Sequence, residues 1–175
     1  WQRTLLALLL ISSPASGAWG QSLSTDSQQF PFLGLVTGDR VNLRAGPGRS
    51  YEILFSLPQR SKVAVFSRVG EWYGIQVPRG VPGYVSREDV ELRESRVVVR
   101  KERIHVRAGS SFAATSLGMV GGEEELQVRR LLGDWVEVEV PHSCRAWVHG
   151  AYVTFLEPYD FEGELPSVAP GPAVR

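Results

Sequence analysis

An internal repeat is the sequence feature that most limits how this chain can fold. The stretch from Gly38 to Gly48 returns in altered form from Lys101 to Ser111, so the second copy begins 63 positions after the first. The same offset continues without a gap, and it pairs the Gly-Glu-Trp at 70–72 with the Gly-Asp-Trp at 133–135. Two copies are too few for a solenoid. We therefore predict two small domains, at 36–94 and 97–157, that fold independently across a short charged connection.

Each copy has the pattern of short strands joined by turns. Val41 and Leu43 alternate with polar residues and lead directly into the Gly-Pro-Gly turn at 46–48. The chain contains 18 Gly and 11 Pro, and it has few long helical patterns. We predict an all-β fold with about five strands in each copy.

The two ends of the chain differ from the copies. An apolar run at 5–11 follows Arg3 and precedes small residues, which is the pattern of a secretory signal peptide at 1–20, although a short buried helix is the alternative. Cleavage could follow Gly17, Ala18 or Gly20. A polar linker is expected at 21–35, and a disordered acidic and Pro-rich tail at 158–175. We predict a periplasmic or secreted protein with no transmembrane segment in its mature chain.

Composition argues against several classes of function. The 19 basic and 19 acidic residues balance, so the chain has no overall field to attract nucleic acid. Cys144 is the single Cys, and although His142 and His149 are near it in sequence, it stands in a predicted turn rather than at a cleft. These three residues also lack a fourth ligand and a metal-binding spacing. We predict a non-enzyme with no metal and no cofactor, and a free thiol that is partly buried.

One further pattern links the copies to a known family. The first copy has Val-Asn-Leu-Arg-Ala-Gly-Pro-Gly at 41–48, then Gly-Glu-Trp at 70–72 and Gly-Tyr-Val at 83–85. This resembles the bacterial SH3-like (SH3b) family, and both copies follow its motif. The second copy departs from it at His105, Ser110, Ser111 and Ala146. The resemblance implies two tandem SH3-like β-barrels that serve as non-catalytic binding modules for peptidoglycan or for envelope proteins.

Five residues of the first copy are candidates for binding such a ligand. Tyr51, Tyr73 and Tyr84 offer flat rings edged by hydroxyl groups, where the second copy has Ala114, Val136 and Trp147. Arg44 and Arg49 flank the 46–48 turn and could bind a carboxylate, although an internal ion pair would also explain Arg44. Trp72 and Trp135 each follow a turn and begin a strand. We expect them to pack inside the barrels rather than to form the floor of a binding groove.

Three functions therefore stay open. The leading one is a tandem SH3b protein that holds peptidoglycan or an envelope protein or peptide. The alternatives are a structural adaptor that recruits another envelope protein, and the targeting part of a cell-wall hydrolase whose catalytic domain lies outside this sequence.

Overall fold

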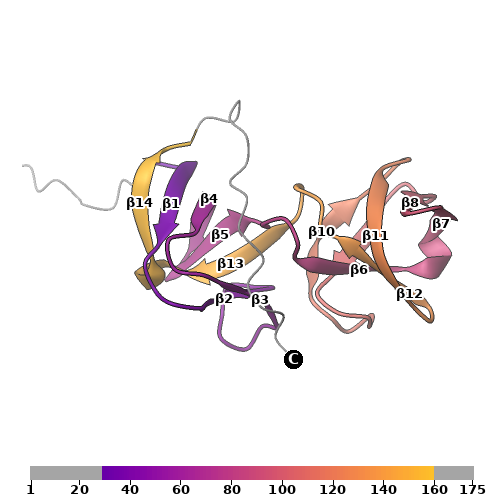
Figure 1. Cartoon of the computed structure of the whole chain (residues 1–175), viewed down its shortest axis with the longest axis horizontal. Coiled ribbons are helices and arrows are strands. Elements are labelled where there is room, and N and C mark those ends of the chain that lie inside the picture. Colours follow the sequence, from indigo (N-terminus) through magenta and orange to yellow (C-terminus); the bar gives the residue numbers. More distant parts are fainter. Residues whose placement is uncertain (1–28, 160–175) are drawn as a thin grey trace, which may run out of the picture.

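The structure, a computed structural model, describes residues 29–159, and these residues form an all-β fold as predicted. The expected signal peptide, residues 21–28 of the expected linker and nearly all of the expected tail lie outside the described residues, and the last part of that linker is wrong, because a strand begins at Phe32. The strands gather in two seven-stranded sheets, each closed into a separate body (Figure 1). Each sheet therefore holds more strands than the five predicted from the sequence.

The repeat in the sequence is also a repeat of elements. The first copy forms β1 (Phe32–Val36), β2 (Val41–Arg44), β3 (Ile53–Leu57), β4 (Lys62–Val69), β5 (Trp72–Gln76), β6 (Pro82–Ser86), the single 3₁₀ turn η1 (Arg87–Asp89) and β7 (Val90–Arg93). The second copy forms β8 (Arg96–Val99), β9 (Ile104–Arg107), β10 (Ser116–Val120), β11 (Glu125–Leu132), β12 (Trp135–Glu139), β13 (Arg145–His149), η2 (Gly150–Tyr152) and β14 (Val153–Pro158).

The pairing of the strands does not follow the boundaries of the copies. The first sheet has the order β14-β1-β4-β5-β13-β2-β3, and the second has β10-β9-β6-β12-β11-β8-β7. The strands β6 and β7 of the first copy thus complete the second sheet, while β13 and β14 of the second copy complete the first (Figure 1). The two copies have exchanged their last two strands.

This exchange corrects the predicted domains at 36–94 and 97–157, because neither range contains all the strands of one sheet. The physical reason is that the exchanged segments have equivalent apolar positions, so the apolar pattern of either segment fits either sheet. Val85 in β6 and Val148 in β13 occupy equivalent positions, and both are fully buried, each in the other copy's sheet. Alternation shows that such a strand has an inner face, but it does not show which sheet lies beneath that face.

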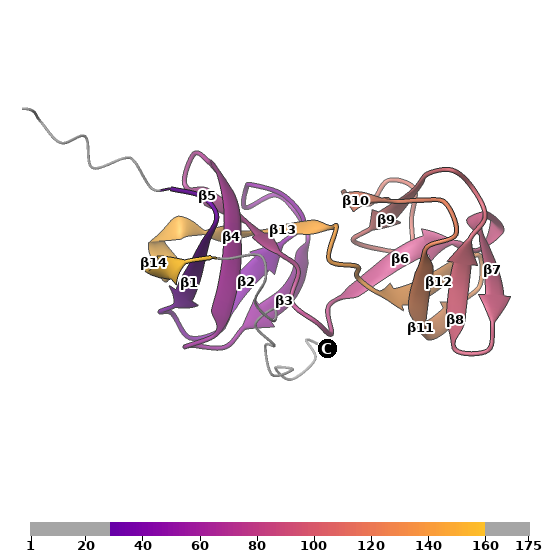
Figure 2. The ribbon, with the colours of Figure 1, turned by 90° about the horizontal axis from the view of Figure 1, so that it is seen from above.

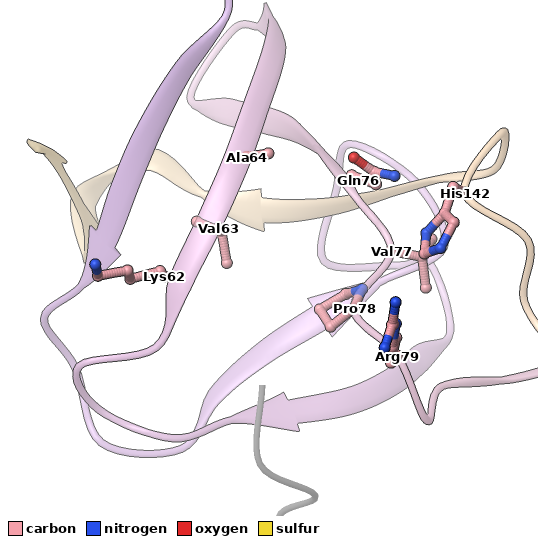
Figure 3. Close-up of a pocket in the computed structure, with 8 residues that line it drawn as sticks. All are labelled: Lys62, Val63, Ala64, Gln76, Val77, Pro78, Arg79 and His142. Atoms are coloured by element: carbon pink, nitrogen blue, oxygen red, sulfur yellow. The ribbon is translucent and has the colours of Figure 1, made fainter. Parts of the chain in front are cut away.

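Two connections carry the exchanged strands between the sheets, as the view from above shows (Figure 2). They run from β5 to β6 and from β12 to β13, and they touch where the Val140 N–H donates to the Val81 carbonyl at 3.3 Å. Arg79 and His142, one from each connection, lie beside a hollow of about 10 Å³ (Figure 3). A hollow of this size has room for roughly one water molecule, so we exclude it as a ligand site.

Equivalent residues of the two copies also meet directly. Glu52 precedes β3, Thr115 precedes β10, and the two are related by the repeat. The backbone N–H and the hydroxyl of Thr115 donate to the Glu52 carboxylate at 3.0 and 2.7 Å. The hydroxyl bond, followed by the backbone bond, lowers the pKa of the Glu52 carboxyl below its ordinary value. The two bodies are therefore joined by polar contacts as well as by strand exchange.

Candidate functional site

A groove of about 450 Å³ opens on the first body, and we call it the first groove. It lies where β2 and the ends of β5 and β13 come together, because β13 pairs with both of its neighbours there. Its walls come from both copies of the repeat. They consist of Gly38, Asp39, Arg40, Val41, Asn42, Arg44, Arg49, Trp72, His149 and Tyr152.

Three aromatic side chains form one wall of the first groove. The ring of His149 stands edge-on to Trp72 at a centroid distance of 5.2 Å, and it lies 5.9 Å from the ring of Tyr152. His149 is fixed in place because its Nδ1 accepts a hydrogen bond from the Ala151 N–H at 3.3 Å, which caps η2. The Glu71 carboxylate lies 3.6 Å from its Nε2. The wall offers flat apolar faces of fixed orientation.

Three guanidinium groups give the first groove a positive charge. Arg44 donates to the Tyr51 carbonyl at 2.8 Å, so it is held by a neutral oxygen rather than by a carboxylate. Arg40 lies 4.0 Å from Asp39, but both side chains are 80% exposed, and such a pair contributes little. Arg49 makes no hydrogen bond or ion pair within residues 29–159. The groove can therefore offer charged donors to an anionic group such as a carboxylate.

The structure separates the five candidate binding residues. Arg44 and Arg49 line the first groove, and the three tyrosines do not. Tyr51 is 38% exposed, but its ring lies over Gly46, where an added Cβ would come within 2.3 Å of it. Its ring and carbonyl thus hold the loop that presents Arg44.

The other two tyrosines lie in different bodies. Tyr73 packs edge-on against Phe32 at 5.7 Å and against Phe30 at 6.3 Å, so it supports the first sheet. Tyr84 belongs to β6 and lies in the second sheet opposite Glu137. Burial, with a smaller contribution from the Glu137 charge, raises the pKa of the Tyr84 phenol. The expected groove of three tyrosines in one barrel is therefore not formed.

Trp72 also differs from its expected place. It is only half-buried and lines the first groove, whereas the sequence led us to expect a core residue. His149 and Tyr152, which sequence reasoning missed, lie 77 and 80 positions after Trp72 in the other copy. Their only sequence signal was their aromatic character, because nothing local to them indicates that β13 crosses to the first sheet.

A second groove occupies the equivalent place on the second body, with a volume of about 370 Å³. Trp135 takes the place of Trp72, and η1 takes the place of η2. Its lining residues are Ser86, Arg87, Glu88, Phe112, Asp134 and Trp135. This groove is likewise assembled from both copies.

Cys144 is fully buried rather than partly buried, and it is a free thiol. Burial raises the pKa of this thiol to about 12, against a smaller opposing effect of the hydrogen bond with the Ser143 side chain. The group is therefore a neutral thiol at physiological pH, which disfavours nucleophilic chemistry. Within residues 29–159, no three His, Cys, Asp or Glu side chains gather as a metal site would require.

Full burial changes the expected effect of substituting this residue. From the sequence, Cys144→Ser should cost about 1 kcal/mol or less. The side chain packs close to Gly118 in the core, so a hydroxyl there must lose its water, and we now expect a cost of about 1–3 kcal/mol. Cys144→Val is the matched control, because Val81 fills the equivalent buried position. Urea unfolding of both variants measures the difference, and equal midpoints for Cys144→Ser and the parent protein would contradict it.

Comparison with known proteins assigns the first copy to a family. Residues 39–91 match the family described as Bacterial SH3 domain. This stretch of the first copy resembles that family. The matched residues include β2 to β5, which belong to the first sheet, and β6, which belongs to the second. The matched stretch therefore contributes to both bodies of the structure.

A curated relative extends the comparison beyond the first copy. The Bacillus subtilis (strain 168) protein YrvJ, which is named as an N-acetylmuramoyl-L-alanine amidase, is 25% identical over 130 residues. The alignment covers 69% of this chain and 25% of YrvJ, so the chain spans about a quarter of that protein. No solved structure matches the chain. None of the described residues belongs to a helix that is long and apolar enough to cross a membrane.

Proposed function

We propose that this protein is a non-catalytic binding protein of the bacterial envelope, and that its first groove holds an acidic group of peptidoglycan. The observation that carries the proposal is the pairing of Arg44 and Arg49, neither bound to a carboxylate, with the aromatic wall of the first groove. A peptide stem of the wall offers carboxylates to the guanidinium groups and apolar atoms to the rings.

The similarity to YrvJ supports a role at the bacterial cell wall. YrvJ is named as an N-acetylmuramoyl-L-alanine amidase, and this chain resembles only a part of it. Binding to the wall without chemistry is the role that such a part would have beside a catalytic domain. The buried, neutral Cys144 agrees with a role that needs no nucleophile. The expected export to the periplasm or to the exterior would place the groove where this ligand occurs.

The test is co-sedimentation of the full chain with purified peptidoglycan. Arg49→Glu should weaken binding by at least about tenfold, because it replaces a charged donor by a repelling carboxylate. Arg103→Glu makes the same change of charge at an exposed place outside both grooves, and it should bind as the parent protein does. Added salt should weaken the binding of the parent protein.

The variant Trp72→Ala tests whether Trp72 acts as a groove residue or as a core residue. We expect this variant to lose at least about tenfold in binding, since the indole provides a face of the groove. Its melting temperature should fall by much less than the loss of a buried aromatic would require. Parent protein that stays in the supernatant would overturn the proposal and favour a structural adaptor for another envelope protein. Equal binding by the parent and both groove variants would place the ligand elsewhere.

A further inference from the structure

The second groove keeps the position of the first groove but changes its chemistry. Phe112 stands where the first groove has Arg49, and Asp89, the counterpart of Tyr152, is not among the lining residues. Trp135 remains as the counterpart of Trp72. Ser86 is the counterpart of His149, so the indole alone is kept from the aromatic wall of the first groove, while Phe112 adds a new ring in place of the cation.

Phe112 and Trp135 form an open aromatic corner. Their ring centroids are 5.0 Å apart and the ring planes meet at 59°. Phe112 is 66% exposed, which makes it the most exposed of the large hydrophobic side chains within residues 29–159. A corner of two rings at the mouth of a groove, with this much apolar surface in water, is suited to cover the flat face of a ligand.

The charged groups around this corner balance. Glu88 and Asp134 are acidic, Arg87 is basic, and the Arg107 guanidinium lies 5.8 Å from the centroid of the Phe112 ring. Counting Arg107, which lies near Phe112 but does not line the groove, two cations and two anions leave no net charge to select an ion, whereas the first groove has three guanidinium groups and one carboxylate, that of Asp39. They do place donors and acceptors together beside the rings. A ligand with hydroxyl groups, each both donor and acceptor, satisfies this set.

We propose that the second groove binds the ring of a neutral sugar, a pyranose whose C–H face stacks on Phe112 and Trp135. Its hydroxyl groups would donate to Glu88 and Asp134 and accept from Arg87. The aromatic corner and the local charge balance are sufficient for this site, which does not depend on ligand binding in the first groove. Because Ser86, Arg87 and Glu88 come from the first copy, the sugar site requires the exchanged strands.

The experiment follows the tryptophan indole N–H signals of the full chain by NMR during titration with the linear trimer of N-acetylglucosamine. The signal that disappears in Trp135→Phe identifies Trp135. We expect this signal to shift progressively with the trimer, while the Trp72 signal stays in place. Phe112→Ala should weaken binding by at least about tenfold, and Phe112→Arg, which introduces the first groove's residue, should do the same. Phe112 is exposed and its ring contacts Trp135, so either change should move the Trp135 signal of the free protein and leave the other indole signals in place.

A second probe and one further variant distinguish a sugar site from a cation site and from the first groove. Nα-acetyl-lysine amide offers an ammonium group, and a shift of the Trp135 signal with this probe but not with the trimer would show a cation site instead. An unchanged Trp135 signal at saturating trimer, or full binding by Phe112→Ala, would overturn the proposal. Arg49→Glu should bind the trimer as the parent protein does. Equal peptidoglycan binding by Arg49→Glu and the parent protein, with retained trimer binding, would therefore contradict only the role of the first groove.

Discussion

A disulfide should form readily between cysteines introduced at Leu35 and Thr154. These residues face each other across β1 and β14, which come from different copies. Directly opposed residues of antiparallel strands have Cα atoms about 4.5–5.5 Å apart, within the range that a disulfide spans. The bond would close a loop of roughly 120 residues and could stabilise the fold by up to about 5 kcal/mol. Non-reducing electrophoresis and peptide mapping of Leu35→Cys/Thr154→Cys measure the outcome.

The repeat supplies a matched control for this cross-link. Glu91 is the counterpart of Thr154 in the first copy, and it would face Leu35 if each copy folded on itself. In the structure Glu91 lies opposite Val98 in the second sheet, so Leu35→Cys/Glu91→Cys should stay reduced. The natural Cys144 should not interfere, because it is fully buried. Cross-linking in the control pair instead would show contiguous domains, and a covalent dimer of the first pair would show exchange between two chains.

Ending the chain at Cys144 should damage the first sheet and spare the second. The truncation removes β13, which lies between β5 and β2, and β14, which pairs with β1. The hairpin β2-β3 would then be cut off from the rest of its sheet, and an isolated hairpin is marginally stable at best. Amide hydrogen exchange should show lost protection in β2 and β3, while their counterparts β9 and β10 retain it.

The opposite result has an equally clear meaning. If each copy closed on itself, β13 and β14 would belong to the second sheet, and their removal would cut off the hairpin β9-β10, the counterpart of β2-β3. Lost protection in β9 and β10, with β2 and β3 still protected, would therefore contradict the exchanged arrangement. Far-UV circular dichroism alone would not distinguish the two outcomes, because the same strands are removed in both.

The all-β class and the equivalence of the two copies could be predicted from the sequence alone, although the number of strands could not. Alternation at Val41 and Leu43, and the turn residues after them, predicted strands that the structure contains, because alternation of side chains is a local property of a strand. The offset of 63 between the copies predicted elements that recur in the same order. The sequence also indicated Arg44 and Arg49 as binding residues, and both line the first groove, since charged residues beside a Gly-Pro turn remain near the surface.

Which copy supplies the last strands of each sheet could not be predicted from the sequence. Tyr84 and Trp147 occupy the same position of the repeat, and Trp147 rather than Tyr84 lies beside Arg44. The grooves follow from that choice, because Trp72 meets His149 and Tyr152 only when β13 crosses to the first sheet. Both arrangements bury the same kinds of side chains and satisfy the same local patterns. The difference between them lies in long-range strand pairing, which alternation, turn residues and repeat length do not encode.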